Sequence, residues 1–313
     1  MPIVIIFSII AGLAFIVLLT SFICFMRVFY FKNPGPMGKD EYELPVGRIY
    51  EPYAEQMIGW MKSLREMQSQ SFEIMSFDGL TLRGKYYECK KDAPIEIMFH
   101  GYQGNSERDL CGGVFRAFRL EHNVLLVDHR AGGASDGRII TFGINERRDC
   151  LGWIDLAISH FGKDCKLILT GVSMGAATVM MASAERLPAN VRYVLADCGY
   201  STAKDIIKKV IREMHLPPEI LYPFVRLGGR IFGRFDLEET SPLEAVKSSN
   251  VPILFIHGNG DDFVPCDMSV ELYGACGSEK ELVIIEGAGH GLAYPVNKEE
   301  YLAALSEFDK KYL

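Results

Sequence analysis

The chain has 313 residues, of which 49% are hydrophobic and 23% charged, a composition typical of a folded globular domain. Its formal net charge of −7 argues against a nucleic-acid partner, because binding phosphates requires a concentrated basic surface. The eight cysteines form neither a CxxC pair nor a cluster with zinc spacing, so we expect reduced thiols and no metal site.

The first apolar stretch, IVIIFSIIAGLAFIVLLTSFICFM (3–26), carries no charge. As a helix it would be about 36 Å long, whereas the hydrocarbon core of a bilayer is about 30 Å thick. A cleaved signal peptide and a buried core helix are the alternatives. The stretch has no basic leader, no shorter apolar region and no small-residue cleavage site. We therefore expect a transmembrane anchor over residues 1–31.

The charges around this stretch indicate its orientation. No lysine or arginine precedes it, whereas Arg27, Lys32, Lys39 and Arg48 follow it. Because positive residues favour the cytoplasmic side, we expect a single-pass membrane protein whose C-terminal domain is cytoplasmic. The cysteines of that domain, which look reduced, agree with this orientation.

Residues 32–71 are predicted to form a linker and an amphipathic helix. The segment KNPGPMG (32–38) resists regular structure because of its prolines and glycines. Apolar residues then recur at helical spacing between residues 53 and 67. We expect this helix to pack against the following domain; a helix lying on the membrane surface is the alternative.

The remaining residues, 72–313, are predicted to form one domain. The segments SFEIMSF and LTLRGKYYE, separated by Asp78-Gly79, predict an antiparallel strand pair. Apolar runs typical of strands then end at Phe99, Val127, Thr170, Ala196, Ile256 and Ile285. Segments of helical length lie between most of these runs, at 106–120, 145–160, 174–186 and 266–275. This alternation predicts the α/β class, a mostly parallel sheet flanked by helices, with ligand sites beyond the carboxyl ends of the strands.

One insertion, at about 201–246, interrupts this alternation. It reads as two or three short helices broken by Pro217-Pro218 and Gly228-Gly229. Its apolar residues are more numerous than a small helical hairpin needs to bury. We therefore expect a small helical lid over the strand ends; an extension that serves only packing is the alternative.

The segment LILTGVSMGAATVMMASAE (167–185) contains the motif G-x-S-x-G between an apolar run and a helix. So tight a turn leaves no room for side chains at Gly171 and Gly175, and it holds Ser173 exposed above the sheet. The helix that follows directs its N-terminal amides at the same place, which favours developing negative charge. Ser173 is therefore the predicted nucleophile.

A serine nucleophile needs a base, and the chain has seven histidines. We predict that His290 is the base, because it follows the last apolar run in the flexible loop GAGHG. The other six are expected to be ordinary surface or structural residues. Of these, His122, His160 and His215 are expected at the surface, His129 in a structural role, and His100 and His257 at strand ends.

The base in turn needs a carboxylate that orients it, and the loop HGNGDDFVP (257–265) offers two. This loop follows the preceding strand, so the chain order becomes serine, aspartate, histidine. That order is the one expected of strand-turn-helix serine hydrolases. It does not distinguish Asp261 from Asp262.

The oxyanion of an acyl-transfer intermediate needs hydrogen-bond donors. The segment IMFHGYQGN (97–105) ends another strand and leaves the backbone N–H of Tyr102 free to face the site. The backbone N–H of Met174, directly after the serine, is its predicted partner. Each such donor stabilises the transition state by roughly 3–4 kcal/mol in known cases.

With these segments the chain resembles the α/β-hydrolase superfamily over roughly residues 72–310, and it looks most similar to the branch of monoacylglycerol lipases and serine-aminopeptidase-like hydrolases. The resemblance rests on HGYQGN, VDHRAGGASDG, GVSMGA, HGNGDDFVP and GAGHG in this order. It implies the α/β-hydrolase fold, and the family pattern H-G-x-x-D-x-x-V-P implies Asp261 as the acid of the triad. Asp197 is the alternative acid, because some relatives place theirs after that strand. Ala131 departs from a common glycine, in a stretch that is structural in the family.

Together these residues predict a serine hydrolase of carboxylic esters, carboxylesterase-like or lipase-like, that forms an acyl-enzyme and needs no cofactor. The anchor and the apolar lid favour hydrophobic, lipid-like acyl substrates. Serine peptidase, amidase or thioesterase activity on the same fold is the alternative. A non-catalytic, membrane-tethered binding module is a further alternative, which the complete set of site residues disfavours.

Overall fold

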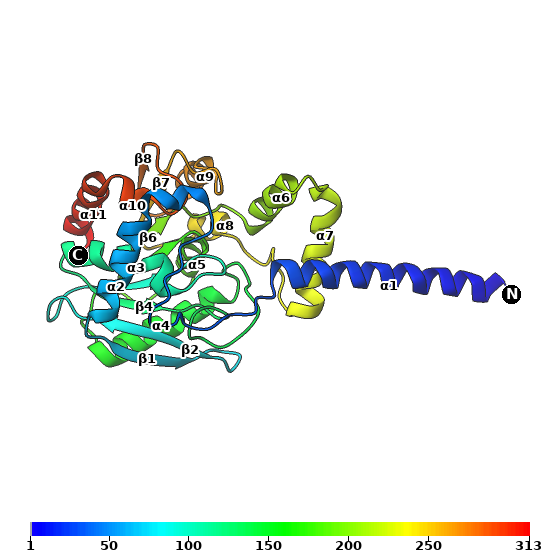
Figure 1. Cartoon of the computed structure of the whole chain (residues 1–313), viewed down its shortest axis with the longest axis horizontal. Coiled ribbons are helices and arrows are strands. Elements are labelled where there is room, and N and C mark those ends of the chain that lie inside the picture. Colours follow the sequence, from blue (N-terminus) through cyan, green and yellow to red (C-terminus); the bar gives the residue numbers. More distant parts are fainter. Residues whose placement is uncertain (1) are drawn as a thin grey trace.

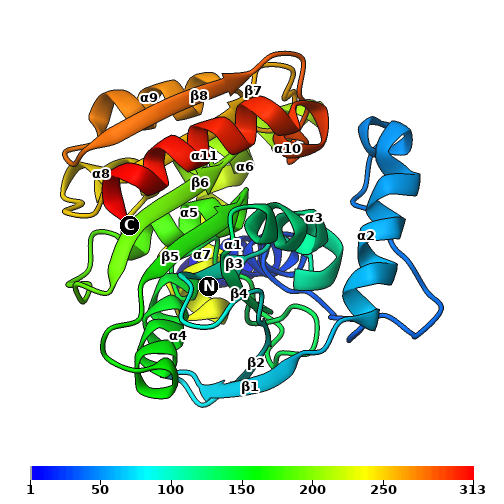
Figure 2. The ribbon, with the colours of Figure 1, turned by 90° about the vertical axis from the view of Figure 1, so that its left-hand side faces the viewer.

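The computed structural model describes residues 2–313, and their strands form an eight-stranded sheet. The strands follow the order β1-β2-β4-β3-β5-β6-β7-β8 across it (Figure 2). Their bounds are β1 (Gln70–Met75), β2 (Thr81–Tyr87), β3 (Ile95–Phe99), β4 (Asn123–Val127), β5 (Leu167–Val172), β6 (Val191–Asp197), β7 (Ile253–Gly258) and β8 (Lys280–Ile285). The pairs β1–β2 and β2–β4 are antiparallel, and all other neighbours are parallel. The predicted α/β class, with an antiparallel pair at its start, is confirmed.

Helices cover both faces of this sheet. Alternate residues of a strand point to opposite faces, so Ile97 and Phe99 lie in one apolar cluster and Met98 in another. The first face carries α4 (Glu146–Phe161), α5 (Met174–Ala182), α8 (Pro242–Lys247) and α9 (Asp267–Ala275). The second carries α3 (Ser106–Arg119), α10 (Ala293–Val296) and α11 (Lys298–Tyr312). With both faces buried, the loops at the strand ends are left to carry the chemistry.

The predicted amphipathic helix is α2 (Ala54–Glu66), which follows a short 3-10 helix (Arg48–Tyr53). Its apolar side chains Met57, Met61 and Leu64 are buried. Met61 and Leu64 share an apolar cluster with α3, and Met57 lies in another with Tyr50 and Leu292. The expectation that this helix packs against the domain is confirmed.

The apolar N-terminal stretch forms the continuous helix α1 (Pro2–Val28), which is long and apolar enough to cross a membrane. Residues 3–19 of this helix are exposed throughout. After the helix, Tyr30 forms an antiparallel β-bridge with Ile139, flanked by two backbone hydrogen bonds of 2.8 Å. The helix therefore projects from the rest of the chain at a joint fixed by backbone pairing (Figure 1).

The insertion contains α6 (Ala203–Glu213), α7 (Pro218–Gly228) and a π-helix (Gly229–Gly233), which are termed the insertion helices below. Pro218 lies in the first turn of α7, as proline favours, and the predicted break before it is present. The break predicted at Gly228-Gly229 is wrong. Both glycines adopt right-handed helical dihedral angles, so the chain continues and only the type of helix changes. The end of the predicted insertion forms α8, which packs on α5 and α9.

One histidine expected at the surface is buried. His122 Nδ1 lies 2.9 Å from Glu96 Oε1, and His122 Nε2 lies 3.3 Å from Asp309 Oδ2. Burial alone would lower the pKa of His122, but the two carboxylates outweigh it and raise this pKa to about 9. Arg116 completes the cluster through its own hydrogen bonds to Glu96. His122 is therefore a charged structural residue, because the buried carboxylate of Glu96 on β3 needs cations beside it.

Candidate active site

Ser173 occupies the turn between β5 and α5. Its φ of 56° and ψ of −115° lie outside the regions that L-residues favour, so the turn is strained. A Cβ atom at Gly171 would lie 2.2 Å from the backbone of Gly175, and one at Gly175 would lie 2.0 Å from the carbonyl oxygen of Phe99. The Ser173 backbone N–H donates to the carbonyl of Asp197 at 2.9 Å, which fixes the turn against β6. The predicted tight turn is present, and both glycines are sterically required.

His290 lies in the loop between β8 and α10, where Gly287 and Gly291 take up positive φ angles of 70° and 65°. Its Nε2 lies 2.9 Å from Ser173 Oγ. The ring of Phe263 meets the imidazole edge to face at 5.0 Å and limits its movement. The imidazole is therefore held within reach of the serine hydroxyl proton.

Asp261 lies on the other side of this imidazole, with its side chain fully buried. Its Oδ2 accepts a hydrogen bond from His290 Nδ1 at 2.7 Å, and its Oδ1 accepts from the backbone N–H groups of Phe263 and Val264 at 2.9 and 2.8 Å. Burial raises the pKa of this carboxyl, but hydrogen bonds from His257 and His290 outweigh it and lower the pKa to about 2. Asp261 is thus a stable anion next to the imidazole.

The two alternative carboxylates lie in different surroundings. Asp262 is exposed, and its backbone carbonyl accepts a hydrogen bond from Lys209 Nζ at 2.6 Å. Asp197 is buried, which raises its pKa, and its Oδ2 accepts from the hydroxyl of Tyr301 at 2.9 Å. The structure thus brings Asp261 into contact with His290, whereas these two make other contacts.

The two predicted oxyanion donors adjoin the serine. Within residues 2–313, neither the backbone N–H of Tyr102 nor that of Met174 donates to another protein group. The Met174 amide opens α5, where the first amides of a helix have no partner within the helix. The preceding loop is close as well, because a Cβ atom at Gly101 would lie 3.7 Å from Ser173 Cβ. Both amides are available to an incoming oxyanion.

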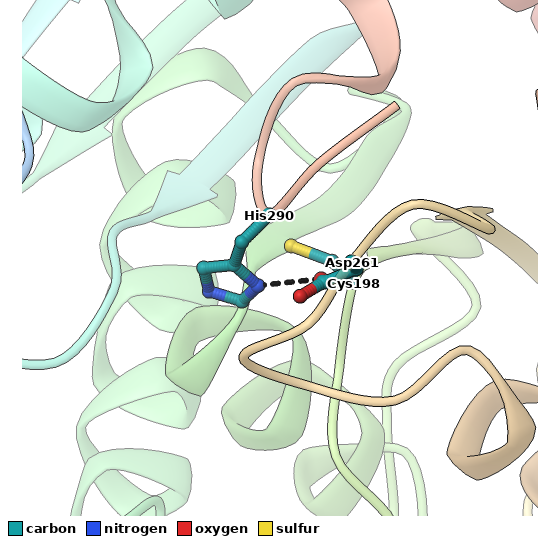
Figure 3. A group of neighbouring side chains, drawn as sticks. All are labelled: Cys198, Asp261 and His290. Atoms are coloured by element: carbon teal, nitrogen blue, oxygen red, sulfur yellow. Dashed lines mark hydrogen bonds and ion pairs between the residues drawn. The ribbon is translucent and has the colours of Figure 1, made fainter. Parts of the chain in front are cut away.

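Cys198 is a neighbour of this site that the sequence did not indicate. Its thiol lies beside Asp261 and His290, with one ligand-capable atom of each within 4.8 Å of the others (Figure 3). Burial raises the pKa of the Cys198 thiol well above its ordinary value, and the neighbouring Asp197 and Asp261 raise it further. Since a metal ligand must be the thiolate, these three groups are poorly suited to hold a metal ion. The sequence signal for Cys198 was its place directly after β6, because parallel strands end at one edge of the sheet.

An apolar cluster surrounds the site on the side of the insertion helices. It joins Met174 to buried side chains of α6 and α7, among them Ile207 and Val225. Tyr102 packs against this cluster through its ring. Ser173 itself is only 7% exposed. The surroundings suit an apolar acyl group, and they leave the nucleophile largely covered.

Comparisons with known proteins indicate the family of this chain. A model of the prolyl oligopeptidase family matches residues 141–313. The uncharacterised protein YqkD of Bacillus subtilis is 28% identical, over 79% of this chain and 81% of its own length. The protein Bem46 of Schizosaccharomyces pombe is 26% identical, over 69% of this chain and 68% of its own.

Solved structures share the fold. An esterase of Pyrococcus furiosus has a TM-score of 0.65 at 22% identity, over 90% of this chain and 99% of its own. An acylaminoacyl peptidase of Pyrococcus horikoshii has a TM-score of 0.57 at 18% identity, over 80% of this chain and 43% of its own. The resemblance to the α/β-hydrolase superfamily is confirmed.

Proposed function

This chain belongs to the prolyl oligopeptidase family and is a serine hydrolase of the α/β-hydrolase fold, and we propose that it cleaves carboxylic esters of hydrophobic acids. The observation that carries this proposal is the unbroken series of hydrogen bonds from Ser173 through His290 to Asp261. A non-catalytic binding module would have no use for a strained serine in contact with a histidine–carboxylate pair.

Each of the three side chains has one role in the proposed mechanism. Ser173 Oγ attacks the acyl carbonyl while His290 Nε2 takes the hydroxyl proton, which it then returns to the leaving alcohol. Asp261 accepts from Nδ1, which fixes the tautomer of the imidazole and stabilises its protonated form. Water then attacks the acyl-enzyme by the same proton transfers and releases the acid.

The tetrahedral intermediates carry an oxyanion, which we assign to the backbone N–H groups of Tyr102 and Met174. Their position beside the serine supports this assignment, as does the absence, within residues 2–313, of another protein acceptor for either amide. Preformed backbone donors need no reorganisation as charge develops, so they stabilise the transition state more than the substrate. No cofactor enters this mechanism.

The apolar cluster around Met174 supports a hydrophobic acyl group over a charged or strongly polar one. Peptide or amide hydrolysis is the second candidate, and the family to which the chain belongs favours it. Thioesters are a third possibility on the same machinery. A fold alone does not select among these three bonds, since all of them pass through the same acyl-enzyme.

A matched substrate panel separates the three. Full-length protein in detergent would be assayed with p-nitrophenyl esters whose acyl groups range from acetyl to palmitoyl. The thioester and the p-nitroanilide of each acyl group would be assayed beside them. We expect kcat/KM to rise with acyl length and to be greater for esters than for anilides, beyond their difference in uncatalysed hydrolysis. A greater kcat/KM for the anilides would overturn the ester assignment, while the serine hydrolase would stand.

We also propose the division of the chain into a membrane anchor (1–31), a linker with an amphipathic helix (32–71) and a catalytic domain (72–313). The length and hydropathy of α1 support the anchor. The basic residues that follow it support a cytoplasmic catalytic domain. A C-terminal reporter that is active only outside the cytoplasm should stay silent, and its activity would reverse this orientation.

A further inference from the structure

The last turns of α1 pack directly against the insertion helices. A Cβ atom at Gly228 would lie 2.4 Å from the carbonyl oxygen of Ser21, so the two helices meet backbone to backbone. The ring of Phe232 lies 5.2 Å from that of Phe22 and 5.8 Å from that of Phe25. Close approach through glycine is typical of helix pairs that stay together. The insertion helices are thus attached to the proposed anchor as well as to the catalytic domain.

The length of α1 sets the level of this contact relative to a membrane. The part of α1 that is exposed throughout, residues 3–19, is about 26 Å long as a helix. A hydrocarbon core is about 30 Å thick, and tilting the helix would require still more residues. A crossing of about 30 Å that begins at Ile3 reaches residues 20–22, which already lie at the insertion helices. Such a crossing would bring those helices to the membrane interface.

The exposed surface of the insertion helices fits this position. Within residues 29–313, four of the ten exposed large hydrophobic side chains lie in the insertion helices or in the turn between α6 and α7. They are 43% to 63% exposed: Met214, Leu216, Ile220 and Ile231. Figure 1 shows α6 and α7 between the sheet and the free part of α1, on the side from which that helix projects. Exposed apolar side chains gathered in this way mark an interaction surface.

The charge of the same segment is compatible with lipid headgroups. Residues 203–233 contain six lysines and arginines and three acidic residues, whereas the whole chain has a net charge of −7. Arg226 and Arg230 pair with Asp236. Within residues 2–313, Lys204 and Arg212 have no carboxylate at ion-pair distance, and long basic side chains of this kind can extend to phosphate groups.

We propose that the insertion helices dock on the lipid bilayer, with the α6–α7 turn and Ile231 in the interface, and that this surface admits amphiphilic esters from the membrane to Ser173. The inference rests on the proposed anchor and the proposed ester hydrolysis. Two contacts link the docked surface to the site. Lys209 holds the loop of Asp261 through the carbonyl of Asp262, and buried side chains of α6 and α7 share the apolar cluster of Met174.

Fluorescence quenching tests the docking without reference to catalysis. The two tryptophans of the chain, Trp60 and Trp153, lie in α2 and α4 and give a constant background. Full-length Ile220→Trp and Ile231→Trp would be reconstituted in phosphatidylcholine vesicles with and without brominated acyl chains. The matched control is Val270→Trp, at an exposed apolar position of α9. We expect bromine to quench the added emission at positions 220 and 231 and not at 270. Equal emission with both lipids at 220 and 231 would overturn the docking.

Hydrolysis gives an independent readout. In the double variant Ile220→Ser, Ile231→Ser we expect hydrolysis of a long-chain ester embedded in vesicles to fall about tenfold, with hydrolysis of a soluble acetyl ester unchanged. Val270→Ser should change neither rate. An equal fall on both substrates, or no fall on the embedded one, would contradict the proposed substrate route. If the unmodified chain hydrolysed neither ester, the proposed function would be refuted instead. The quenching result would then still decide the docking by itself.

Discussion

His257 Nε2 lies 3.2 Å from Oδ2 of Asp261, the same oxygen that accepts from His290 Nδ1 at 2.7 Å. The carbonyl oxygen of Val264 lies 2.9 Å from the same His257 nitrogen, so this nitrogen faces two acceptors and must carry the proton. His257 Nδ1 then accepts from the hydroxyl of Ser269 at 2.6 Å. A buried histidine therefore acts as a second donor that holds the carboxylate in place.

From this contact we expect His257→Leu to lower kcat about tenfold with little change in KM, because Asp261 loses a donor and orients His290 less well. His257→Gln should restore much of kcat, since an amide can donate to the same oxygen. Steady-state kinetics with a short ester would measure both variants. Equal activity of the two variants would show that His257 only fills space.

The two adjacent aspartates form a matched pair for testing the triad. Asp261→Asn should lower kcat/KM by a factor of about 10³–10⁴, because an amide favours the wrong tautomer of the imidazole. Asp262→Asn should stay within about twofold of the unmodified protein, because an exposed side chain does not contact the imidazole. If the two effects were exchanged, the family pattern would have been aligned one residue out of place.

The low pKa of Asp261 also predicts how stability depends on pH. Its folded-state pKa of about 2 lies below the ordinary value of 3.8, so the ionised carboxylate stabilises the fold above pH 4 by about 2 kcal/mol. This contribution declines as the pH falls from about 4 through 2. The free energies of unfolding of the unmodified protein and of Asp261→Asn, measured in detergent, should therefore converge as the pH falls through this range. A constant difference between the two would contradict the assigned pKa.

Two glycine substitutions, one in the strained turn and one in α9, should have opposite effects on stability. Gly175→Ala should destabilise the fold by more than about 3 kcal/mol and abolish activity, because its Cβ atom would meet the backbone carbonyl of Phe99. Gly274→Ala should stabilise the fold by up to about 1 kcal/mol, because this position in α9 has open space and a helix favours alanine. Thermal unfolding would compare the two. A mild effect of Gly175→Ala would mean that the turn can relax.

Much of this architecture could be predicted from local pattern. Alternating strands and helices give a parallel sheet, and a glycine on either side of Ser173 gives the tight turn, because both depend on residues close in sequence. The meeting of Ser173, the loop of Asp261 and Asp262, and His290 follows as well, since parallel strands deliver their final loops to one edge of the sheet. Only the resemblance to a family separated Asp261 from Asp262.

Other features depend on contacts that no local pattern records. His122 looked like a helix-end surface residue, and its burial depends on Glu96 and Asp309, which are remote in sequence. The packing of α1 on the insertion helices rests on Gly228, whose partner Ser21 lies some two hundred residues earlier. Gly228-Gly229 suggested a break because glycine disfavours helix, yet tertiary packing overrides this preference.

Labelling with a fluorophosphonate tests the central claim most directly, because the probe reacts with a serine only where a base activates it. Full-length protein in detergent should be labelled at Ser173, and Ser173→Ala should abolish the label. Ser159→Ala, which removes an exposed serine of α4, should leave labelling unchanged. Labelling that persists in Ser173→Ala, or a folded unmodified protein that the probe does not label, would contradict a serine hydrolase built on Ser173, His290 and Asp261.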